Sequence, residues 1–263
     1  LVIKAFDRRG KEKWKADNGP AWRGADDDPA WGSRYPDSRS APTVTNGRLY
    51  VLSGAGRLGC FDAATGRKIW LVPVRENFKG SAPVCGYAES VLVDGERVVC
   101  SPGGRQAALV ALDTKTGRLA WRTRKFEDDA SYGSAILCEH AGRRQIVTMT
   151  AKHAIGVDPV NGRLLWRYRH DGMRGAGNMS ACTMVFRDGG LYGSIGHGIG
   201  GFKLQLRGPD SAGRFEAVQV WADGALDNLH GGLVLVDGHI YGSKFFTSSR
   251  GSWVCLDFQT GKA

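Results

Sequence analysis

The chain has 263 residues, of which 42% are hydrophobic and 24% charged, and its formal net charge is +10 at pH 7. This length allows a sizeable core, and no run approaches the roughly 18 apolar residues that a membrane-spanning helix needs. A basic balance can indicate nucleic-acid binding. Here, however, the arginines stand mostly one per predicted turn rather than in a stripe. We therefore expect no specific nucleic-acid partner and no membrane span.

One phrase recurs along the chain: an aspartate, a few residues, a glycine, a basic residue and then a tryptophan. In chain order it reads DRRGKEKW at 7–14, DAATGRKIW at 62–70, DTKTGRLAW at 113–121, DPVNGRLLW at 158–166 and the partial copy DFQTGKA at 257–263. The repeat tryptophans are Trp14, Trp70, Trp121, Trp166 and Trp221. The turn residues are Asp62, Gly66, Asp113, Gly117, Asp158, Gly162, Asp257 and Gly261. A period near ~50 residues with one turn signature per period predicts a repeat architecture.

Each repeat divides into four short runs rich in β-branched, aromatic and aliphatic residues. In the repeat at 40–70 these runs are separated by Asn46-Gly47, by Gly54-Ala55-Gly56 and by the Asp62–Gly66 turn. Such turns join antiparallel strands. A small four-stranded sheet buries both faces only by stacking on its neighbours. The sequence therefore predicts an all-β propeller of about five blades, with each repeat tryptophan on the outermost strand between neighbouring blades.

Two segments in the second half depart from this pattern. Between Leu204 and Trp221 the usual turn is replaced by a longer hairpin that contains Pro209 and Gly213. We expect this hairpin either to form a contact surface or to have drifted as outer turns do. The glycine-rich stretch 196–201 (GHGIGG) is followed by a strand-like run rather than a helix. A phosphate-binding loop needs a helix N-terminus, so we predict a hairpin there.

Six cysteines occur without metal-binding spacing or a Cys-Cys pair. Cys60 and Cys255 occupy the same position in two repeats, directly before Phe61-Asp62 and Leu256-Asp257. In the repeat between them this position is Ala111, a small residue. We therefore expect both cysteines to be buried thiols.

The D-x-x-T-G-x-x-x-W phrase resembles the repeat of the pyrroloquinoline-quinone (PQQ) type propellers. This group includes quinoprotein alcohol dehydrogenases and BamB-like proteins, and the resemblance is greatest to the planctomycete-type members. It implies about eight blades, so we expect residues 1–263 to be a fragment of a single propeller domain with both ends inside repeats. It also implies PQQ and calcium as possible cofactors. The adjacent-cysteine pair typical of the dehydrogenases is missing here.

In a propeller the ligand site lies at one mouth of the central channel, where outer strands lead into the next innermost strands. Polar residues stand at five such strand entrances: Arg39, Glu89, Tyr132, Asn178 and His230. By resemblance, glutamate and asparagine are the residue types that ligate calcium beside PQQ, and a histidine can act as a general base. The alternative is that these side chains satisfy strand ends and channel waters. We assign no catalytic residue and no metal ligand.

Three functions remain open after these observations. The first is a noncatalytic binding or scaffold module of the bacterial envelope, with protein partners or a small ligand at the channel mouth. The second is a PQQ- and calcium-dependent dehydrogenase of alcohols or sugars. The third is the sensor domain of a larger multidomain protein. The resemblance implies a periplasmic location, and we expect the signal region to lie outside this sequence.

Overall fold

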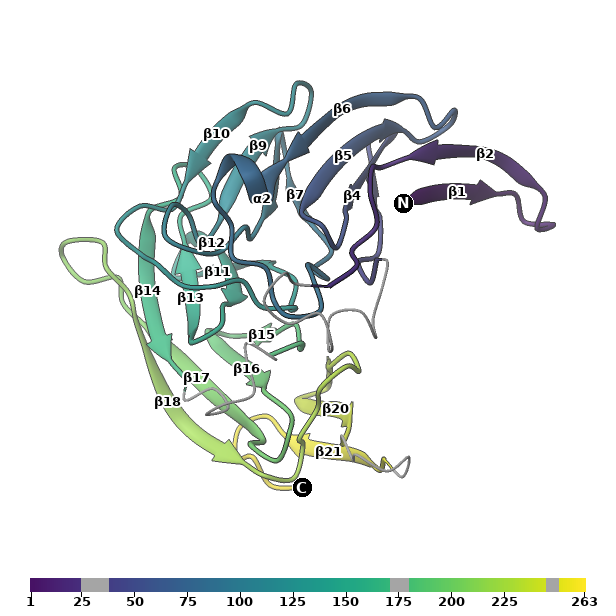
Figure 1. The fold of residues 1–263 in the computed structure, drawn as a ribbon. Helices are drawn as coiled ribbons and strands as arrows, with labels where there is room; N and C mark the ends of the chain where they lie inside the picture. The colour runs from purple at the N-terminus through teal and green to yellow at the C-terminus, as the bar shows by residue number, and fades with distance from the viewer. Residues whose placement is uncertain (25–37, 171–179, 245–250) are drawn as a thin grey trace. The chain divides into compact units, whose positions relative to one another are not determined.

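The computed structural model describes residues 1–24, 38–170, 180–244 and 251–263. These residues form two compact units, Leu1–Ala130 and Ser131–Ala263. Both units consist of antiparallel sheets whose strands follow one another in chain order (Figure 1). The all-β prediction is confirmed, and the single 1–263 domain stays a prediction.

The first unit contains two four-stranded sheets and one two-stranded sheet among its described residues. The two-stranded sheet is β1 (Val2–Phe6) and β2 (Glu12–Asp17). The next is β3 (Thr43–Thr45), β4 (Arg48–Leu52), β5 (Arg57–Asp62) and β6 (Lys68–Pro73), followed by the short helix α2 (Val74–Asn77). The third is β7 (Leu92–Asp94), β8 (Arg97–Cys100), β9 (Val110–Asp113) and β10 (Leu119–Arg122).

The second unit contains two four-stranded sheets and one three-stranded sheet among its described residues. The first is β11 (Ile136–His140), β12 (Arg143–Met149), β13 (His153–Val157) and β14 (Leu164–Arg169). The next is β15 (Val185–Arg187), β16 (Gly190–Ser194), β17 (Gly201–Arg207) and β18 (Glu216–Asp223). The last is β19 (Val234–Val236), β20 (His239–Ser243) and β21 (Trp253–Asp257). Four complete sheets and two partial ones agree with the predicted count of about five blades.

The turn that carries the repeated aspartate has the same construction in three of the sheets. Asp62 accepts hydrogen bonds at Oδ1 from the backbone N of Ala64 and from both the backbone N and Oγ1 of Thr65, at 2.8 to 3.1 Å. The glycine that ends the turn, Gly66, has a φ of 73°, which an L side chain rarely adopts. Asp113 and Asp257 make the same three bonds. The sequence signature therefore encodes a local hydrogen-bonded turn.

Three of the repeat tryptophans, Trp14, Trp70 and Trp221, join their sheet to the turn of the next sheet. Trp70 donates from Nε1 to the backbone O of Thr114 at 3.0 Å, and its ring lies against Gly117, where a Cβ would be 2.9 Å from Cδ2 of the indole. The same pairing joins Trp14 to Ala63 and Gly66, and Trp221 to Gln259 and Gly261. Glycine is required in these turns both by its positive φ and by the indole packed on it.

Trp166 differs because the next sheet lacks the regular turn. Its Nε1 donates to Oε1 of Gln145 in its own sheet at 2.6 Å, and its ring packs over Gly156. The β17–β18 hairpin instead packs Phe215 against the hydrophobic cluster that contains Trp166. The backbone N of Phe215 also donates to the O of Leu165 at 3.4 Å. The irregular hairpin thus replaces one mode of docking between sheets with another.

Each outer strand carries a bulge directly before its repeat tryptophan. In five sheets the register between the last two strands shifts by one residue at this point. The extra residues are Lys13, Ile69, Ala120, Leu165 and Val220. Bulges twist an edge strand and hinder pairing with another chain, so the repeat combines docking with protection of its outer edge.

One cysteine prediction is correct and the other is wrong. Cys60 is buried with 0% exposure, opposite the buried Tyr50. Cys255 occupies the same position, opposite Tyr241, but it is exposed and Tyr241 is 41% exposed. The difference arises because the following sheet covers the Tyr50–Cys60 face, whereas the equivalent face of the β19–β21 sheet is not covered by the described residues.

Candidate functional site

The strand entrances of the first unit are held by hydrogen bonds between neighbouring sheets. The segment before β3 donates from the backbone N of Ala41 to Oγ of Ser90 at 3.1 Å. Thr43 donates from Oγ1 to the O of Val91 at 2.7 Å. Arg39, one of the predicted ligand-binding residues, donates from Nη1 to the backbone O of Cys85. These groups fasten the start of one sheet to the start of the next.

Glu89, the second predicted residue, lies in the interior with 2% of its surface exposed. Its Oε1 accepts a 2.5 Å hydrogen bond from the backbone N of Ser101, and its Oε2 accepts one from Ser101 Oγ at 3.0 Å. Burial raises the pKa of Glu89 to about 7, although the Ser101 hydrogen bonds oppose this effect. Both carboxylate oxygens are therefore already engaged within the protein.

The strand entrances of the second unit are also joined by hydrogen bonds between neighbouring sheets. The backbone N of Tyr132, the third predicted residue, donates to the O of Ser180 at 3.1 Å. The backbone N of Ser134 donates to Oγ1 of Thr183 at 3.1 Å. Both pairs are about one repeat apart in sequence, as are Ala41 and Ser90. The entrance hydrogen bonds are thus a property of the repeat.

The last two predicted residues are Asn178 and His230. Asn178 is outside the described residues. His230 is exposed in the segment between β18 and β19, directly after the buried pair Asn228 and Leu229. Arg39 and Glu89 belong to the first unit and Tyr132 and His230 to the second, so the grouping of the five residues at one channel mouth stays a prediction.

Sequence reasoning missed a polar cluster that holds the loop between β16 and β17. The buried carboxylate of Asp227 accepts from the backbone N of Gly198 at 2.7 Å and from that of Gly200 at 2.9 Å. Next to it, Asn228 donates from its backbone N to Oγ of Ser194 at 2.8 Å. The glycine-rich stretch is thus a hairpin, as predicted, and its backbone donors are occupied by an internal carboxylate. The sequence shows only the Asp227-Asn228 pair after the outer strand, which does not by itself identify this contact.

The calcium implied by the resemblance is not matched by the described donor groups. Calcium takes six to eight oxygen ligands, several of them carboxylates. Within 1–24, 38–170, 180–244 and 251–263 no three His, Cys, Asp or Glu side chains are grouped so that they could hold a metal ion. The described residues therefore do not fit a calcium and PQQ site.

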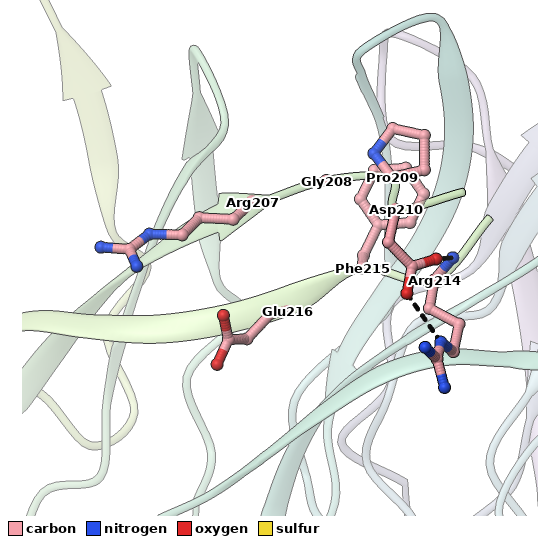
Figure 2. A pocket seen from close by; sticks show the side chains of 7 residues that line it. All are labelled: Arg207, Gly208, Pro209, Asp210, Arg214, Phe215 and Glu216. Atoms are coloured by element: carbon pink, nitrogen blue, oxygen red, sulfur yellow. Dashed lines mark hydrogen bonds and ion pairs between the residues drawn. The ribbon is translucent and has the colours of Figure 1, made fainter. Parts of the chain in front are cut away.

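An open pocket of about 420 Å³ is present at the irregular β17–β18 turn. Figure 2 shows its lining residues: Arg207, Gly208, Pro209, Asp210, Arg214, Phe215 and Glu216. Asp210 orders the turn by accepting from the backbone N of Ala212 and Arg214, both at 2.9 Å, and by pairing with Nε of Arg214 at 2.8 Å. The side chain of Arg207 extends away from this ion pair (Figure 2). A rigid turn with an exposed cation can contact a partner.

In the part of the chain that the structure describes, no helix is long and apolar enough to cross a membrane.

The sequence is similar to the quinoprotein alcohol dehydrogenase PedH of Pseudomonas putida, with 26% identity over 215 residues, which is 76% of this chain and 33% of that relative. The chain thus spans about a third of the length of this relative.

Two solved structures share the fold at low sequence identity. One is BamB from Moraxella catarrhalis, with a TM-score of 0.61 and 15% identity, covering 99% of this chain and 65% of that chain. The other is the quinohemoprotein alcohol dehydrogenase of Comamonas testosteroni, with a TM-score of 0.61 and 18% identity, covering 92% of this chain and 48% of that chain. Both likenesses confirm the propeller fold and leave the function open.

The family comparison covers the entire chain. Residues 1–263 match the PQQ repeat family that is described as outer membrane protein assembly factor BamB. The repeated turn, the tryptophan docking and the four-stranded sheets are the structural counterparts of this match. This protein therefore belongs to the PQQ-like repeat family of BamB.

Proposed function

We propose that this protein is a noncatalytic binding or scaffold module of the bacterial envelope. The observation that carries the proposal is the use of the polar strand entrances within the fold itself. Glu89 accepts one hydrogen bond from Ser101 at each carboxylate oxygen, and the segments next to Arg39 and Tyr132 bind neighbouring sheets. Groups that are already engaged in internal hydrogen bonds are poorly placed to take a cofactor, because their loss would leave buried partners unsatisfied.

The periplasmic location and the protein partners are part of this proposal. They are supported by the family description, which refers to outer membrane protein assembly. The second candidate, a PQQ- and calcium-dependent dehydrogenase of alcohols or sugars, is favoured by the similarity to PedH over 76% of this chain. Against it, no three His, Cys, Asp or Glu side chains are grouped to hold a metal ion among the residues that the structure describes.

A cofactor titration of the full-length protein separates the two candidates. The protein is titrated with PQQ in the presence of calcium, and binding is followed by the absorbance of the quinone and by calorimetry. A dye-linked assay with ethanol and glucose measures oxidation in parallel. The proposal predicts no saturation at tens of micromolar, which corresponds to a binding free energy weaker than about −6 kcal/mol. Saturable binding with turnover would establish the dehydrogenase instead.

The pocket at the β17–β18 turn is the surface that we propose for partner contact. A photo-crosslinking amino acid at Arg207 is compared with the same group at Lys115, an exposed position on a regular turn. In cells of the source organism, the proposal predicts a discrete adduct from position 207 and none from position 115. Equal adducts at both positions, or none at 207, would remove this surface from the proposal.

A further inference from the structure

Lys203 is a buried lysine at a position that is small or uncharged in the equivalent strands. It lies on β17 opposite Trp221 on one side and Tyr192 on the other. The residues that pair with the repeat tryptophan in the other four-stranded sheets are Cys60, Ala111 and Gly156. Lys203 is only 2% exposed, and a buried cation costs free energy unless it is compensated. Its presence there calls for a specific partner.

That partner is the turn of the next sheet. The ammonium group of Lys203 lies 4.4 Å from the centre of the Phe258 ring, a cation–π contact. Its Nζ also donates to Oε1 of Gln259 at 3.3 Å. Trp221 donates to the backbone O of the same Gln259 at 3.0 Å. Burial lowers the pKa of Lys203, and the nearby carboxylate of Asp257 opposes this effect.

A glycine in the neighbouring strand leaves room for the contact between Lys203 and Phe258. Gly190 on β16 lies beside it: a Cβ there would be 2.9 Å from Cε1 of Phe258 and 3.1 Å from Cε of Lys203. The equivalent first residues of β4 and β8 are Arg48 and Arg97. In the first unit it is Arg48 that donates to a turn, from Nη1 to the O of Thr114. In the β15–β18 sheet the basic donor is therefore on the third strand, as Lys203, and the second-strand position that is Arg48 in the β3–β6 sheet is Gly190.

Only one of the regular turns offers the groups that Lys203 contacts. The two residues after the turn aspartate are Phe258-Gln259 here, and in the other regular turns they are Ala63-Ala64, Thr114-Lys115 and Pro159-Val160. An aromatic ring and an amide oxygen occur together only in the first of these pairs. The Thr114-Lys115 pair would place a second ammonium near Lys203, which like-charge repulsion disfavours.

We propose that Lys203 selects the turn that docks on the β15–β18 sheet, so that the Phe258-Gln259 turn, and not that of another repeat, occupies this position. In a protein built of similar repeats, such a pair sets the order in which sheets pack and disfavours exchange between repeats. The contact acts by attraction to Phe258 and Gln259 and by repulsion of a basic turn residue.

A turn exchange tests the selection. The pair Phe258→Thr with Gln259→Lys gives the Asp257 turn the residues of the Asp113 turn. Chemical unfolding of the full chain is measured for this exchange in the wild-type background and in the Lys203→Cys background, which has the residue found at this position of the β3–β6 sheet. The exchange should lower the unfolding midpoint in both backgrounds, because the buried Phe258 ring is lost in each, and the proposal predicts a larger loss when Lys203 is present. Equal losses in both backgrounds would overturn it. The Lys115→Gln variant, at an exposed turn position, is the control for the effect of turn composition alone.

Amine labelling keeps the proposal testable if an exchanged variant does not fold. Lysines of the natural protein are acetylated under native conditions, and the rate at each site is read by mass spectrometry. Lys203 is predicted to react much more slowly than the exposed Lys115, and to become faster in the Phe258→Leu variant while Lys115 is unchanged. A Lys203 rate equal to that of Lys115 in the natural protein, or one unaffected by Phe258→Leu, would contradict the docking contact.

Discussion

Two junctions between sheets show how the repeat works and how it can be replaced. Where the β3–β6 sheet meets the β7–β10 sheet, Trp70 binds the Asp113 turn through Thr114 and Gly117. Where the β11–β14 sheet meets the β15–β18 sheet, Trp166 binds Gln145 instead, and Phe215 fills the junction from an irregular hairpin. The turn signature therefore serves docking, and one buried aromatic residue can take over this role where the signature is lost.

The largest expected effect is at the regular junction. Trp70→Ala should lower the free energy of unfolding by about 3–5 kcal/mol, because it removes a buried indole and its hydrogen bond. Trp253→Ala is the matched control, since that indole is 83% exposed and its loss should change stability by less than about 0.5 kcal/mol. Urea unfolding measures both, and similar losses for the two variants would contradict the docking role.

The irregular junction should depend on Phe215 to a nearly equal extent. Phe215→Ala should cost about 3 kcal/mol, because the ring is buried in the cluster that contains Trp166. The same urea measurement applies. A loss below about 0.5 kcal/mol would mean that Phe215 does not hold the two sheets together. The irregular junction would then not be equivalent to the junction that Trp70 forms.

Two glycines with the same backbone conformation separate turn strain from docking. Gly117 and Gly213 have φ values of 71° and 69°, but only at Gly117 would an added Cβ have neighbouring atoms within 4 Å, the nearest being Cδ2 of Trp70 at 2.9 Å. Gly213→Ala should cost about 1–2 kcal/mol from the left-handed conformation alone. Gly117→Ala should cost about 1–3 kcal/mol more, from overpacking against the indole. Equal costs by thermal unfolding would show that the indole does not constrain the turn.

The smallest effect concerns the protonation of the turn aspartates. Hydrogen bonding by Thr116, first through its side chain, lowers the pKa of Asp113. Because a lowered pKa stabilises the folded state above the unfolded value, this contribution is lost as the pH falls through the folded pKa. In Thr116→Val the pKa of Asp113 should rise, as measured by NMR titration. The pKa of Asp210, which Arg214 lowers instead, should stay constant in that variant, and a parallel shift at Asp210 would point to a general change in the protein.

The fold could be predicted from the sequence because the turn signature is local. The turn is closed by hydrogen bonds and a positive φ among Asp62, Thr65 and Gly66, which are only a few residues apart. The repeat can therefore be recognised in the amino-acid sequence alone. The exposure of Cys255 could not be predicted, because it depends on which sheet covers its face rather than on its own strand. Two repeats with the same residue pair, Tyr50–Cys60 and Tyr241–Cys255, therefore have opposite burial.

The candidate site was less predictable for the same reason. Asp227 reaches Gly198 and Gly200 across 29 and 27 residues of sequence, and no local pattern announces the contact. Lys203 was recognisable only once the bulge before Trp221 had set the register that aligns it with Cys60. The polar character of the strand entrances was visible in the sequence, whereas their use as hydrogen-bonding partners of Ser101, Ser90 and Ser180 required the structure.

The most direct test of the account is the stability of the natural protein and of Glu89→Gln, each at pH 5 and pH 8, with and without PQQ and calcium. Because burial raises the pKa of Glu89 to about 7, its contribution is greatest at low pH and falls as the pH rises from the ordinary value to about 7, by about 3 kcal/mol. We expect Glu89→Gln to be the more stable protein at pH 8, and we expect the cofactors to stabilise neither protein. A stabilisation by PQQ and calcium that the natural protein shows and Glu89→Gln lacks would contradict it and make Glu89 a cofactor ligand.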